Sequence, residues 1–200
     1  MLNERIPTEQ IIFAGVIAGL CSAVCTGVGI VSIVRSVMTG RTAMTAAVSI
    51  MFGTCLLYLI VRLVSVSMIN TRAGETMSRI TLDLAYLAAA CSLFPYCFGA
   101  SFSARGWVAF GLLCGTSVLM IIHASIWHLK FWKIACFIFL AGFAASLILI
   151  MPAANLFTYL SLTAFTAGLF MLRNPGMFLF RSVLLPSGIT LGALGALYVG

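Results

Sequence analysis

Apolar residues fill almost the whole chain in seven stretches that are separated by short polar segments. A helix needs about 20 apolar residues to cross the roughly 30 Å hydrocarbon core of a bilayer, and each stretch is about that long. Within lipid a helix satisfies its own backbone hydrogen bonds. The pattern therefore predicts an all-α integral membrane protein, with residues 1–200 forming a single transmembrane domain, a seven-helix bundle. The expected spans are about Ile11–Val34, Ala43–Val66, Ile80–Ala100, Gly106–Trp127, Trp132–Met151, Asn155–Leu172 and Met177–Val199.

Composition supports this interpretation, because 62% of the residues are hydrophobic and 8% are charged. Soluble domains are about one-quarter charged, so a water-soluble protein is excluded. The net charge of +7 would indicate a nucleic-acid partner in a soluble chain. Here most basic residues lie at span ends, where they orient helices, and we expect no nucleic-acid partner.

The distribution of Lys and Arg predicts the orientation of the bundle, since short cytoplasmic loops carry an excess of positive charge. The side of the N-terminus collects eight basic residues, whereas the opposite side has three, so we expect the N-terminus in the cytoplasm and the C-terminus outside. The eight are Arg5, Arg62, Arg72, Arg79, Lys130, Lys133, Arg173 and Arg181, and the three are Arg35, Arg41 and Arg105.

Small residues and prolines mark points of close packing and bending. Gly15 and Gly19 are four residues apart, as are Gly188 and Gly192, which lets helix backbones approach one another. We favour packing within the bundle over a dimer seam for both pairs, and the oligomeric state stays open. Pro95 and Pro186 are expected to kink the third and seventh spans.

Three charged residues lie about one turn or more inside a span, where charge is costly and marks candidate functional sites. Arg62, Asp83 and Arg181 are each expected about one turn from the cytoplasmic end of their span. A carboxylate between two guanidiniums can be fully paired. We favour a structural ion pair, or snorkelling of the arginines, over ligand binding, because neither needs a substrate. Arg79, one turn before Asp83, can take the same carboxylate locally.

Cys55 and Tyr58 precede Arg62 by seven and four residues, so the three share one helix face. An inert, packed Cys55 is favoured over a reactive thiol. His123 and His128 are the only histidines, and their five-residue spacing does not suit two ligands on one helix face. A histidine zinc site is therefore not expected, and we find no motif of a soluble enzyme.

Several short stretches carry a resemblance to a known family: Cys55–Leu59, Leu82–Leu84, Ala90–Pro95 and Met177–Arg181. With the length and the seven spans, they resemble the hemolysin III proteins, the bacterial branch of the progestin and adipoQ receptor family. That family has Ser-x-x-x-His in span two, often with a Tyr before the His, an Asp and a small-residue stretch ending in Pro in span three, and His-x-x-x-His in span seven. This chain keeps the Tyr, the Asp and the Pro, and lacks the three histidines.

Those histidines hold the zinc of the family near the cytoplasmic face, so the resemblance implies a chain without that metal and, by our expectation, without a cofactor. The proposed hydrolase activity of the family then loses its main support. One hypothesis follows from the alignment: Arg181 stands where a zinc ligand would be, and supplies positive charge opposite Asp83 in place of the ion.

The function expected from these observations is a hemolysin III-like multi-pass protein of the bacterial cytoplasmic membrane. It would bind a membrane lipid or another hydrophobic ligand near the inner leaflet. The alternatives are a zinc-dependent lipid hydrolase of the ceramidase or adiponectin receptor kind, a small transporter or channel with Asp83 in its path, and a structural subunit of a membrane complex. Lysis is implied by the family name alone. The candidate polar cluster is Asp83, Arg62, Arg181, Tyr58 and Cys55.

Overall fold

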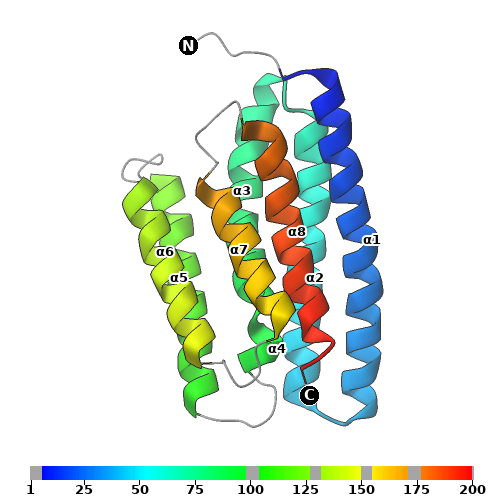
Figure 1. The fold of residues 1–200 in the computed structure, drawn as a ribbon, viewed down its shortest axis with the longest axis vertical. Coiled ribbons are helices and arrows are strands. Elements are labelled where there is room, and N and C mark those ends of the chain that lie inside the picture. The colour runs from blue at the N-terminus through cyan, green and yellow to red at the C-terminus, as the bar shows by residue number, and fades with distance from the viewer. Residues whose placement is uncertain (1–5, 98–103, 127–131, 150–154, 171–176, 200) are drawn as a thin grey trace.

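The fold is all-helical in a computed structural model that describes residues 6–97, 104–126, 132–149, 155–170 and 177–199, and these residues contain no β-strand. Figure 1 shows the long helices lying side by side along the longest axis of the molecule. The described helices are α1 (Thr8–Met38), α2 (Thr42–Ser67), α3 (Arg72–Ser92), α4 (Phe94–Cys97), α5 (Ala104–Ile126), α6 (Trp132–Leu149), α7 (Leu156–Phe170) and α8 (Phe178–Ala196).

The helices run alternately up and down, so that the two chain ends lie at opposite ends of the bundle (Figure 1). At one end, the Asn70 side chain between α2 and α3 exchanges two hydrogen bonds with the backbone of Ile6. At the other end, Arg35 of α1 donates to the carbonyl of Leu197, just after α8. These contacts join segments far apart in the sequence and fix the ends of α1, α2 and α8 in register.

Among the described residues, four segments are long and apolar enough to cross a membrane. They also expose large apolar side chains, such as Ile12, Val34 and Ile60, on the outer surface of the bundle. An apolar surface of this extent is not stable in water, whereas it is matched by lipid. The protein is therefore an integral membrane protein. The four segments are Thr8–Met38, Thr42–Ser67, Thr76–Cys97 and Phe178–Ala196.

Helix α3 differs most from its predicted bounds, since it begins eight residues before Ile80 and ends at Ser92. Its start is capped by Thr71, whose side chain accepts a hydrogen bond from the backbone N–H of Gly74 over 3.3 Å. The helical path is interrupted at Leu93, and the short α4 follows. Pro95 explains the interruption, because proline has no N–H for the helix and its ring clashes with the carbonyl four residues earlier.

Close packing of α8 against α7 and α3 depends on Gly188 and Gly192. A Cβ on Gly188 would lie 3.0 Å from the backbone nitrogen of Phe165, and one on Gly192 would lie 2.7 Å from Ser92 Oγ. This glycine pair therefore packs within the bundle as predicted. Gly15 and Gly19 do not, since a Cβ at either position would meet no described atom within 4 Å. Their face of α1 points away from α2 and α8.

Candidate functional site

One face of α2 carries a row of buried polar side chains in the last three turns of the helix. Cys55 and Tyr58 are 0% exposed, and Arg62 is 8% exposed, so the three share one buried face as their spacing predicted. Ser65, which is three residues beyond Arg62, is buried as well. The row thus runs from the apolar core toward the end of the bundle where the N-terminus lies (Figure 1).

Arg62 is held by residues of the first turns of α8. Its Nη2 donates a hydrogen bond of 2.6 Å to Oγ of Ser182, which is fully buried. Its guanidinium carbon lies 5.9 Å from the centroid of the buried Phe178 ring. Arg181 shares this ring, with its guanidinium carbon 5.5 Å from the same centroid. The structure therefore brings two of the predicted cationic residues together at one aromatic side chain.

Arg62 has no carboxylate partner among the residues that the structure describes. A guanidinium has five N–H donors. Among the described side chains, Ser182 alone accepts a hydrogen bond from Arg62. Nearby hydroxyls are unsatisfied too, because Tyr58 Oη and Ser65 Oγ are buried with no hydrogen-bond partner. Buried polar groups are normally paired, so this cluster has an unused capacity for hydrogen bonds.

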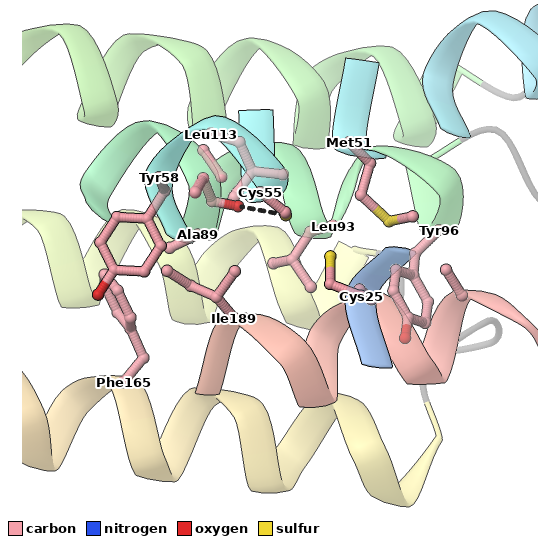
Figure 2. Packing of buried hydrophobic residues seen from close by; sticks show 14 of the residues in the cluster. Cys25, Met51, Cys55, Tyr58, Ala89, Leu93, Tyr96, Leu113, Phe165 and Ile189 are labelled. Carbon is pink, nitrogen blue, oxygen red and sulfur yellow. Dashed lines mark hydrogen bonds between the residues drawn. The ribbon is translucent and has the colours of Figure 1, made fainter. Parts of the chain in front are cut away.

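Cys55 belongs to the hydrophobic core. It is not part of the arginine cluster, by which we mean Arg62 and Arg181 with Tyr58, Ser65, Phe178 and Ser182. Its thiol lies two turns from Arg62 and donates to the carbonyl oxygen of Ala88 in α3 over 3.8 Å. Figure 2 shows this contact among apolar side chains that include Leu113 of α5 and Ile189 of α8. A fully buried thiol in such surroundings packs as a small apolar residue, which is the inert role that the sequence favoured.

Asp83 does not pair with Arg62 in the described part of the chain. Its Oδ1 is buried and has no hydrogen-bond partner. Residues three and four positions apart share a helix face. Tyr86 contacts Phe165 of α7 with ring centroids 6.4 Å apart, and Leu87 packs in the cluster that includes Phe110 of α5. The neighbours of Asp83 on this face therefore pack against α5 and α7, and the cluster around Leu87 also includes Ala47 of α2.

Several residues considered above lie outside the described residues. These are Arg5, Trp127, His128, Lys130 and Arg173, together with the side chains of Arg72, Arg79, His123 and Lys133. Within the part of the chain that is described, no group of three or more His, Cys, Asp or Glu side chains is placed so as to hold a metal ion.

The sequence reasoning missed three members of the arginine cluster: Ser65, Phe178 and Ser182. Ser65 carried a usable signal, because it continues the helical period of Tyr58 and Arg62. Phe178 and Ser182 carried none, since their role comes from the packing of α8 against α2.

Compared with known proteins, the chain matches no family model, no curated protein and no solved structure.

Proposed function

We propose that this protein is a seven-span, hemolysin III-like protein of the bacterial cytoplasmic membrane that binds a lipid near the inner leaflet without a metal. In this proposal α1, α2, α5, α6, α7 and α8 each cross the membrane, and α3 with α4 makes the remaining crossing. The up-and-down arrangement in Figure 1 supports it, as does the excess of Lys and Arg at the end of the bundle where the N-terminus lies.

The observation that carries the proposal is the burial of Arg62 in an apolar helix without a carboxylate partner among the described residues. Arg62 lies five residues before the end of α2, which is about 8 Å at the helical rise of about 1.5 Å per residue. That depth suits the boundary between lipid head groups and acyl chains. A lipid is the ligand most available there, and its polar head would satisfy the cluster while its chains cover the apolar helices.

Lipid binding is tested by native mass spectrometry of the full chain, purified in a mild detergent from bacterial membranes. We expect a retained lipid that survives collisional removal of detergent, at about one molecule per chain. Arg41→Met, at the opposite end of the bundle, is the matched control and should retain the same amount. A protein that sheds all lipid under conditions that preserve its fold would contradict the proposal.

Metal content is tested on the same sample by elemental analysis. The proposal expects less than stoichiometric zinc after purification without chelators, because the three family histidines are missing from the matching stretches. One zinc per chain would overturn the metal-free proposal and would restore the lipid hydrolase as the better function.

A second candidate, a small transporter or channel, is favoured by Asp83. A carboxylate with a buried, unpartnered oxygen inside a membrane bundle is typical of proton and ion pathways. Reconstituted protein should then carry protons or cations across liposomes, and Asp83→Asn should abolish the flux. Flux that is absent from the wild-type protein, or unchanged by Asp83→Asn, would remove this candidate.

A further inference from the structure

We infer that the site between α2 and α8 binds an oxyanion, carried as the head group of an anionic membrane lipid, with Arg62 and Arg181 as its cationic ligands. The inference rests on the proposed function and adds to it the charge and chemical class of the ligand, and the residues that recognise it.

The first argument is the charge balance around Arg62. The guanidinium is 8% exposed, and the described residues offer it one hydroxyl and one aromatic ring, both neutral. A buried cation without an opposite charge is strongly unfavourable. A second guanidinium, that of Arg181, lies at the same Phe178 ring. An anion bound between or beside the two guanidiniums would provide the opposite charge that the described residues do not provide to Arg62.

The second argument is the set of hydroxyl groups on the same helix face. Tyr58 Oη lies one turn before Arg62 and Ser65 Oγ lies one turn after it, and neither has a hydrogen-bond partner. Both side chains are at most 1% exposed, so bulk water does not reach the two hydroxyls to serve as the missing partner. A hydroxyl donates readily to a negatively charged oxygen. A phosphate or carboxylate group supplies several acceptors at once, which suits a cluster rich in donors.

The third argument is the start of α8. Met177, in the N-cap position, makes no side-chain hydrogen bond to the first turn, so no cap side chain there competes for the first backbone N–H groups. The N-terminal end of a helix carries a partial positive charge that favours anions. Arg181 and Ser182 both belong to the first turns of this 19-residue helix. Helix and side chains thus favour the same sign of ligand charge.

Binding of lipids that differ in head-group charge tests the inference. Delipidated full-length protein in detergent is titrated with phosphatidylglycerol or with phosphatidylcholine of identical acyl chains, and bound lipid is counted by native mass spectrometry. The choline group would bring a further cation to the two guanidiniums, so the wild-type protein should bind phosphatidylglycerol at least about tenfold more tightly. Inorganic phosphate is added in a parallel arm, to separate a lipid-borne oxyanion from a free one.

Arg62→Met and Arg181→Met should each weaken binding of phosphatidylglycerol by about tenfold and leave binding of phosphatidylcholine unchanged. Arg41→Met, which removes an exposed arginine at the opposite end, should keep the wild-type preference. Loss of fold is checked by thermal unfolding without lipid. Arg62→Met should unfold at the same temperature as the wild-type protein or higher, because it removes a buried charge that has no opposite charge among the described residues.

Equal affinity for the two lipids in the wild-type protein would overturn the inference and leave lipid binding in place. A preference for phosphatidylglycerol that survives in both arginine variants would also overturn it. Displacement of phosphatidylglycerol by inorganic phosphate in the wild-type protein, but not in Arg62→Met, would support the oxyanion and assign it to a soluble source. Failure to bind either lipid would overturn the proposed function as well.

Discussion

Two buried tyrosines differ in whether their hydroxyl groups have a hydrogen-bond partner. Tyr58 in α2 is fully buried and its hydroxyl has no hydrogen-bond partner. Tyr96 in α4 is equally well buried, but its hydroxyl donates to the carbonyl of Gly192 in α8 over 3.1 Å. The hydroxyl of Tyr96 therefore stabilises the junction between α4 and α8, whereas the hydroxyl of Tyr58 makes no hydrogen bond to the described residues of the protein.

Replacing each tyrosine by phenylalanine tests whether its hydroxyl contributes to stability. Tyr96→Phe should lower the free energy of unfolding by about 1 kcal/mol, because a buried hydrogen bond is lost. Tyr58→Phe should leave it unchanged or raise it by up to about 1 kcal/mol, since no hydrogen bond is lost. Chemical unfolding in mixed detergent micelles provides the comparison. A Tyr58→Phe variant that is destabilised as much as Tyr96→Phe would show that the hydroxyl of Tyr58 has a partner in the protein.

Part of the candidate site was predictable at this scale. The helical period alone placed Tyr58 and Arg62 on one face, and burial confirmed it. Whether Asp83 pairs with Arg62 was not predictable, because it depends on which side of α3 faces α2. The sequence gives the spacing of residues along one helix, but the rotation of that helix against its neighbours is set by the packing of the whole bundle.

At the scale of helices, α8 is the element on which the packing of the bundle depends. It contacts α1, α2, α3 and α7, and its buried glycines let two of these neighbours approach closely. Ser161 of α7 donates to the carbonyl of Gly188, and Asn155 donates to that of Gly195 over 2.9 Å. Small residues and interhelical hydrogen bonds are the usual source of helix association in lipid.

The two glycine pairs provide a test of the claim that the packing of the bundle depends on the small residues of α8. Gly188→Val should lower the unfolding temperature markedly, by an amount equivalent to about 1–3 kcal/mol, because its side chain would meet the backbone of α7. Gly15→Val, in the same kind of small-residue spacing on α1, should change stability by no more than about 0.5 kcal/mol. Thermal unfolding in detergent compares the two. Equal destabilisation by both substitutions would contradict the packing seen for α1 and α8.

The elements themselves were largely predictable. The apolar stretches gave α2 and α8 with ends within three residues of the expected bounds. The start of α3 was missed because its first two turns, Arg72–Arg79, are polar and precede the apolar stretch that predicted the span. The cap by Thr71 and continued backbone hydrogen bonding form these turns, and neither requires apolar side chains.

For the whole molecule, the ends of the chain give the most direct test of the proposed seven crossings. An odd number of crossings places the N-terminus and the C-terminus on opposite sides of the membrane. We expect a reporter fused to the N-terminus to be active in the cytoplasm and one fused after Gly200 to be active outside. A single-cysteine labelling experiment at Arg41 and at Asn70 should give opposite accessibility. Both termini on the same side would contradict the proposed topology.

With the proposed topology, the proposed anion site would lie at one end of the bundle, within the cytoplasmic leaflet. An experimental structure of the protein in nanodiscs that contain phosphatidylglycerol is the most direct test of this placement. We predict head-group density within hydrogen-bonding distance of the guanidiniums of Arg62 and Arg181, with acyl chains along α2 or α8. A structure in which Arg62 instead pairs with a carboxylate of the protein, and no lipid reaches it, would contradict the account.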